Sequence, residues 1–82
     1  MQSGEVFNLE RVEFRQKGGG SSTSASVDVY DVTAAAVIDS TTLGSTSTTG
    51  GTSGSGNVVV VRVSNSTGAA IDAAPIVRGW IA

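Results

Sequence analysis

Apolar and polar residues alternate along most of the chain with a period of two, the period of an extended strand. Valine, isoleucine and threonine fill the alternating stretches, and these residues favour strands over helices. Glycine, serine and asparagine cluster between the stretches and indicate turns. The pattern predicts an all-β protein. The expected strands are Glu5–Gln16, Ser26–Val32, Ala36–Leu43, Asn57–Ser64, Ala69–Ala74 and Ile76–Ala82.

The first expected strand has an irregular pattern. Phe7 and Leu9 fall on one parity, whereas Val12 and Phe14 fall on the other. A period of two cannot place all four side chains on one face. A bulge near Glu10–Arg11 would bring them together, because one extra residue reverses the parity. The alternative is two short strands that belong to different sheets.

The remaining signals describe the connections. Thr33–Ala35 is the expected turn of an antiparallel hairpin. Pro75 is expected to stop the strand before it, because proline cannot donate a hydrogen bond to a ladder. Residues 1–82 therefore form one small antiparallel β-sandwich or jelly-roll-like barrel of about six to eight short strands.

One long segment, Gly44–Gly56, consists only of glycine, serine and threonine. It has no apolar side chain to bury, so alone it should be a mobile loop. We expect a neighbouring subunit to order it and shortening it to leave the fold intact. Its interface candidates are Gly44, Gly50, Gly51 and Gly56.

The strand with four consecutive valines, Val58 to Val61, is apolar on both faces. One interpretation is a central strand that is covered on both sides. The other is a strand with its odd-numbered valines, Val59, Val61 and Val63, in the core. In that case its other face contacts a partner subunit, and Arg62 could pair with an acid there. The interface candidates on that face are Val58, Val60 and Arg62.

Composition favours self-association. The chain has 82 residues, is 39% hydrophobic and contains only four aromatic residues, so its core is small. It has no cysteine for a disulfide and no histidine, a common metal ligand. Oligomerisation is the stabilising device that remains. We expect a trimer or larger, with neither cofactor nor metal.

Charge and hydropathy argue against two classes of partner. The net charge is −2, and the five cations are scattered rather than gathered in a stripe, so nucleic-acid binding is not expected. The apolar runs are far too short for a membrane-spanning helix. The N-terminus lacks the charged and apolar regions of a secretory signal, so we expect synthesis inside the cell without secretion by that route.

The polar residues form no recognisable catalytic or metal-binding motif. Serine and threonine have no histidine to activate them. The acids of the expected strands, such as Asp28 and Asp31, lack the spacing of a calcium loop and are interpreted as solvated or turn-capping. Glu10 and Glu13 differ in parity, and Arg11 and Arg15 can neutralise them locally. An enzyme is not expected.

The stretches ASVDVYDVTAAAVIDSTTL at 25–43 and NVVVVRVSNSTGAAIDAAPIVRGWI at 57–81 resemble small all-β structural proteins of tailed viruses of bacteria or haloarchaea. The shared features are alternating valine strands, Ser/Thr/Gly loops and a final strand of the form P-x-V-x-G-x-I. The resemblance implies a virion subunit, either a capsid decoration (cement) protein or a minor head or tail protein. It implies contact with a larger shell or tail protein and no catalytic residues.

The alternative function is a small extracellular module that binds carbohydrate or a cell surface. Trp80 and Tyr30 distinguish the two functions. A binding module presents these aromatic rings in an exposed groove, whereas a structural subunit buries them or places them in an interface. A lone tryptophan in a small domain is more commonly a core residue, so we expect Trp80 in the core.

Overall fold

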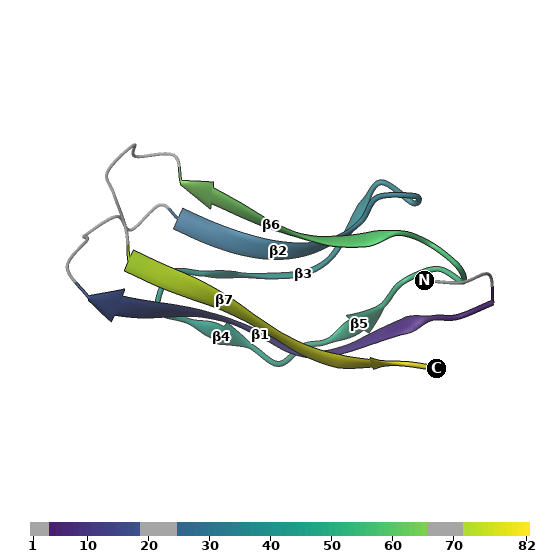
Figure 1. Cartoon of the computed structure of the whole chain (residues 1–82), viewed down its shortest axis with the longest axis horizontal. Helices are drawn as coiled ribbons and strands as arrows, with labels where there is room; N and C mark the ends of the chain where they lie inside the picture. The colour runs from purple at the N-terminus through teal and green to yellow at the C-terminus, as the bar shows by residue number, and fades with distance from the viewer. Residues whose placement is uncertain (1–3, 19–24, 66–71) are drawn as a thin grey trace.

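The computed structural model describes residues 4–18, 25–65 and 72–82. The protein is all-β, and two antiparallel sheets face each other as a small β-sandwich (Figure 1). The expected fold class is confirmed. The strands are β1 (Phe7–Gly18), β2 (Ala25–Asp31), β3 (Ala36–Thr42), β4 (Thr46–Ser47), β5 (Gly51–Thr52), β6 (Val59–Asn65) and β7 (Asp72–Ile81).

The first sheet is built around β1. Strand β7 pairs along one edge of β1, and the two short strands β4 and β5 share its other edge. The second sheet has the order β3-β2-β6. Within the described residues, β6 and β7 are therefore edge strands, one in each layer of Figure 1.

The core lies between β1 and β2. The pairing of β1 with β7 shifts register between Leu9 and Arg11, so the bulge expected there is confirmed. Because of this bulge, residues of both parities reach the inner face of β1. Strand β2 has no such irregularity toward β6 and buries every second residue. The buried apolar residues are Leu9, Val12, Phe14, Ala25, Val27 and Val29.

Strand β7 runs through Pro75, so the expectation that this proline ends a strand is wrong. Val6 and Ala82 exchange two backbone hydrogen bonds, of 2.9 and 3.0 Å. In an antiparallel pair the backbone N–H and C=O groups of successive residues point alternately to the two sides of the strand. The backbone groups of the even-numbered residues of β7 therefore point toward β1. The nitrogen of Pro75 then faces the free edge, where its missing hydrogen costs no ladder bond. Residues 69–71 of the expected strand lie outside the described residues.

The Gly/Ser/Thr segment 44–56 is ordered by the chain's own backbone. It contains β4 and β5, and backbone hydrogen bonds join its two ends and its middle to β1 and to the residues before β1. The Gly44 nitrogen donates to the Phe14 carbonyl (2.7 Å), the Ser53 nitrogen to Phe7 (2.9 Å) and the Gly56 nitrogen to Glu5 (2.7 Å). The prediction that it needs a neighbouring subunit for order is therefore wrong. Segments without apolar side chains can still supply the backbone groups that an edge strand pairs with.

Glycine is required in this segment for close approach. Gly50 has a φ of 76°, and a Cβ atom there would lie 2.8 Å from the carbonyl oxygen of Leu9. At Gly51, a Cβ atom would lie 2.8 Å from the Cγ2 atom of Ile38. Gly44 has a comparable φ of 82° but open space around the Cβ position. Contacts within the chain thus account for glycine at positions 50 and 51.

This contrast yields a matched pair of substitutions. We expect Gly50→Ala to cost about 2–4 kcal/mol, because it combines left-handed strain with a clash against backbone. Gly44→Ala has the strain without the clash and should cost about 1–2 kcal/mol. Urea unfolding of the two variants measures the difference. Equal losses would show that the 44–56 segment does not press against β1.

The buried carboxylate of Asp31 connects this segment to the second sheet. Asp31 ends β2 on its inner face and is only 3% exposed. Its oxygens accept hydrogen bonds from the Gly54 nitrogen (3.0 Å), the Ala34 nitrogen (3.0 Å) and the Asn57 side-chain amide (2.9 and 3.1 Å). The bond from Gly54, followed by that from Asn57, lowers the pKa of Asp31 below its ordinary value. The turn-capping interpretation is confirmed for this residue.

Candidate interaction surface between strands β6 and β7

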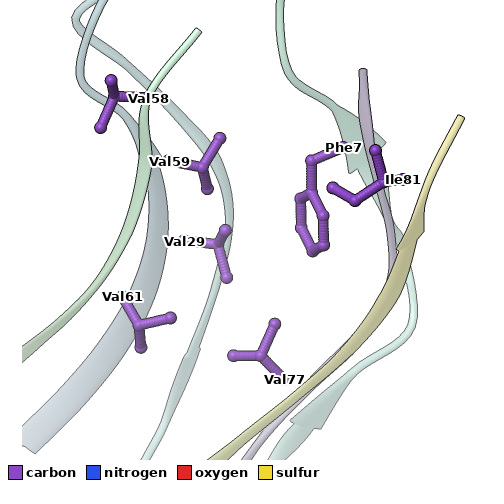
Figure 2. Close-up of a pocket in the computed structure, with 7 residues that line it drawn as sticks. All are labelled: Phe7, Val29, Val58, Val59, Val61, Val77 and Ile81. Carbon is purple, nitrogen blue, oxygen red and sulfur yellow. The ribbon is translucent and has the colours of Figure 1, made fainter. Parts of the chain in front are cut away.

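An apolar groove opens between the two sheets where β6 and β7 face each other. We call it the β6–β7 groove. Its volume is about 370 Å³. Figure 2 shows Val59, Val29 and Val61 turned toward Phe7, Val77 and Ile81 on the other wall, whereas the Val58 side chain points away from that wall. One wall comes from β2, β6 and the residue before β6, and the other from β1 and β7. The lining residues are Phe7, Val29, Val58, Val59, Val61, Val77 and Ile81.

The odd-numbered valines of β6 lie on its inner face, where Val59 and Val61 line this groove, and none of them is fully buried. In the register with β2, Val61 lies opposite the buried Val29, and Val63 opposite the buried Val27. Their direction therefore agrees with the sequence-based prediction. However, Val61 is 46% exposed and Val63 51% exposed, so the predicted core position of these two valines is wrong, whereas Val59 is partly buried and packs against the core. The physical reason is that β6 is an edge strand, and no further strand of the described residues lies beside it to complete the cover.

The edge position also excludes the interpretation of β6 as a central strand. Among the described residues, β6 pairs only with β2. The Val32 nitrogen donates to the Val58 carbonyl (2.9 Å), and the Leu43 nitrogen donates to the Ala25 carbonyl (3.0 Å). The first bond joins even-numbered residues across β2 and β6, and the second shows that an odd-numbered residue of β2 bonds β3 instead. The even-numbered residues of β2 and β6 therefore share the backbone hydrogen bonds between these strands. The backbone groups of Val59, Val61 and Val63 therefore point to the free edge.

The outer face of the second sheet carries an ion pair. Arg62 donates two hydrogen bonds to the Asp28 carboxylate, at 2.8 and 2.7 Å, and its guanidinium lies 3.7 Å from the centre of the Tyr30 ring. The bond with Asp28 raises the pKa of Arg62. The sequence-based prediction paired Arg62 with an acid of a partner subunit. The structure supplies that acid from the neighbouring strand of the same chain.

The predicted interface residues fall at separate places. Val58 lines the β6–β7 groove, whereas Val60 lies opposite Tyr30 on the outer face. Gly44 and Gly50 flank the short strands on the edge of β1 that is opposite β7, and Gly51 belongs to β5 on the same edge. Gly56 lies beside Glu5, two positions before Val58. The structure thus does not gather these glycines and valines into one surface.

Trp80 lies on the outer face of the first sheet, opposite Asn8, and is 55% exposed. Its predicted place in the core is wrong, because even positions of β7 point away from the second sheet. Tyr30 lies on the other sheet under Arg62, so the two rings form no common platform. Farther along β1, opposite Ile76, Glu13 pairs with both Arg11 (2.7 Å) and Arg15 (3.2 Å). The bond from Arg11 is the largest of the effects that lower the pKa of Glu13.

The groove offers hydrophobic contact and no reactive group, since every lining side chain is a hydrocarbon. Across the described ranges, no three His, Cys, Asp or Glu side chains gather where they could hold a metal ion. In the same ranges, no helix has the length and apolar character needed to cross a membrane. The arrangement is suited to binding another apolar surface.

Sequence reasoning missed the second wall of the groove. Phe7 and Ile81 stand opposite each other in the register of β1 and β7, and Val77 stands opposite the buried Val12. The signal was present in the P-x-V-x-G-x-I pattern, whose Val77 and Ile81 share one parity. What the pattern could not reveal is that β7 lies at the edge of its sheet.

No protein-family model matches the chain, and no curated protein or solved structure matches it either. The geometry and chemistry of its own residues therefore carry the functional argument.

Proposed function

We propose that this protein is a non-enzymatic structural subunit of a virus particle, a capsid decoration (cement) protein or a minor head or tail protein. It acts through contacts with copies of itself and with a larger shell or tail protein. The observation that carries the proposal is the open β6–β7 groove, whose walls leave Val58, Val61 and Ile81 about half exposed. Contiguous exposed apolar surface on a small protein marks an interaction site.

The hydrophobic core of this chain is small. Six buried apolar residues form the core of the described part of the chain, and a comparable set of valines and isoleucines remains exposed. Covering such surface contributes about 25 cal/mol per Å². A partner that closes the groove would therefore add substantially to the stability of a domain that has neither disulfide nor histidine-ligated metal. The virion setting comes from the resemblance in the valine strands and Ser/Thr/Gly loops.

Light scattering on the purified chain tests the proposal. We expect an oligomer whose assembly is weakened by Val59→Lys. The matched control is Val37→Lys on β3, which adds the same charge at an exposed valine outside the groove. Mass spectrometry of purified particles should detect the chain. A stable monomer that is absent from particles would contradict the proposal.

The alternative, a carbohydrate- or surface-binding module, is favoured by one observation, the exposure of Trp80. Trp80 is the single tryptophan of the chain, so its fluorescence reports directly on any ligand that stacks on it. Saturable quenching of the Trp80 fluorescence by an oligosaccharide would support this alternative. So would oligosaccharide binding measured by calorimetry that is lost in Trp80→Ala without a change in the unfolding midpoint.

A further inference from the structure

The free edge of β6 is unusually suited to pairing with another strand. The amide and carbonyl groups of Val59, Val61 and Val63 point away from β2, and no described residue pairs with them. Natural edge strands are commonly protected by a proline, a lysine, a bulge or an inward-pointing charge. None of these devices is present at the three valine positions.

Strand β7 borders the same groove, but its free edge is protected against pairing with another strand. Pro75 places a nitrogen without hydrogen at its free edge, so one donor of a possible ladder is missing. Arg78 lies opposite Arg11 in the register of β1 and β7, which adds positive charge to the outer face of this sheet. A second chain is therefore expected along β6 rather than along β7.

We propose that two copies of this chain pair through β6, antiparallel, about a two-fold axis at Val61. The two three-stranded sheets then become one continuous sheet of order β3-β2-β6-β6-β2-β3. This inference rests on the proposed function and specifies the surface by which the subunit contacts a copy of itself. A two-fold axis suits the contact, because it applies one self-complementary patch to both copies.

The register follows from the backbone and the side chains together. Only odd-numbered residues can form the hydrogen-bonded pairs, because only their backbone groups point to the free edge. Centring on Val61 places Val61 opposite its own copy and Val59 opposite Val63 of the second copy. Centring on Val63 would instead place Val61 opposite Asn65. The Val61 register is favoured because valine meets valine at every inner-face position.

Charge is compatible with this pairing. On the outer face, Arg62 would lie opposite Val60 of the second copy. The Arg62 charge is already balanced by the bidentate bond to Asp28, so the contact brings together no unpaired charge. The aliphatic stem of Arg62 can cover the neighbouring valine while its guanidinium stays on Asp28 and Tyr30.

Part of the surface that a dimer would cover is apolar and exposed. A standard interface removes about 800 Å² from each partner, roughly one sixth of the 4617 Å² that this chain exposes. Strand β6 presents the exposed valines Val60, Val61 and Val63, and the groove beside it adds Val58 and Ile81. Pairing along β6 would set the grooves of the two copies next to each other and enclose their exposed side chains.

A cysteine at the axis tests the register. The chain contains no cysteine, so a single Val61→Cys variant has one thiol per copy. Hydrogen-bonded antiparallel partners have Cα atoms about 5.5 Å apart, within the range that a disulfide spans. Under mild oxidation we expect most of the Val61→Cys protein to migrate as a covalent dimer on a non-reducing gel. Val37→Cys, exposed on β3, and Val59→Cys alone should remain largely monomeric on the gel, whereas a mixture of Val59→Cys and Val63→Cys should cross-link.

A proline at the same position tests the pairing without cysteine chemistry. The Val61 nitrogen donates to no described residue, so Val61→Pro removes no ladder bond between β2 and β6. We expect at least a tenfold weaker self-association in light scattering, with the β-type circular dichroism retained. If Val61→Pro unfolds, Val61→Lys replaces it, since an inward-pointing charge at an edge also blocks pairing.

The outcomes separate this inference from the proposed function. A wild-type oligomer with efficient Val61→Cys cross-linking supports both. An oligomer in which Val61→Cys does not cross-link, or a trimer that Val61→Pro leaves intact, overturns the β6 pairing while the proposed structural role stands. A monomer at every concentration overturns the β6 pairing, and the detection of the chain in particles then decides the proposed function.

Discussion

A chain in which residues 45–55 are replaced by a tight turn should fail to fold. The replacement removes β4 and β5 and leaves one edge of β1 unpaired. It also removes the hydrogen bonds that Phe7 and Phe14 exchange with the segment. We expect a loss of more than about 4 kcal/mol, a large part of the stability of a domain this small. Circular dichroism and the thermal transition measure it.

This expected result is the reverse of the one that composition alone suggested, which was a fold indifferent to the loop. The control keeps the length and both strands: Thr48 and Thr49 lie between β4 and β5, are exposed, and can be changed to serine. That variant should unfold at nearly the wild-type temperature. If the shortened chain kept a cooperative transition, β4 and β5 would have no part in holding β1.

Replacing Asp31 by alanine should produce the largest loss of stability of any single polar substitution in the described residues. The change removes a buried carboxylate and leaves the Gly54 nitrogen, the Ala34 nitrogen and the Asn57 amide without their acceptor in partly buried bonds. Donors left unsatisfied in this way cost more than the bond itself contributes. We expect a fall of many degrees in the unfolding temperature, and the end of the 44–56 segment should exchange its amide hydrogens faster.

Two variants identify the source of that loss. Asn57→Ala removes one donor and leaves the bonds from Gly54 and Ala34, so its effect should be clearly smaller. Asp28→Ala breaks only the exposed pair with Arg62 and should change stability little. An Asp31→Ala protein as stable as Asp28→Ala would show that Asp31 does not fasten the segment.

Protonation at low pH should remove the contribution of Asp31 to the stability of the fold. Its pKa is lower in the folded protein than in the unfolded chain, so the ionised form stabilises the fold. This stability is fully present above the unfolded pKa, about 3.9, and is lost as pH falls through the lower folded value. Glu13 acts in the same direction. The wild type should therefore lose stability below about pH 4, and Asp31→Asn should lose less over the same range.

Local patterns in the sequence determined much of this fold. Alternating valines located β2, the valine run located β6, and the turn expected at Thr33–Ala35 located β3. The change of parity between Leu9 and Val12 indicated the bulge in β1. These features are readable because side-chain direction depends only on neighbouring backbone dihedrals and on which residues must avoid water. The sequence also shows directly that the chain has no histidine and no cysteine, so it has no disulfide and no metal site with histidine or cysteine ligands.

The tertiary structure alone decided which strands are edges. Pro75 could continue β7 because its nitrogen faces the free edge of the sheet, and Val61 and Val63 are exposed because none of the described strands pairs beyond β6. The 44–56 segment is ordered because β1 had an unpaired edge and Asp31 had unused acceptors, facts about residues far away in the chain. Strand order depends on which distant segments of the chain pair with each other. Because side chains alternate with a period of two both at the centre and at the edge of a sheet, the sequence pattern does not distinguish these positions.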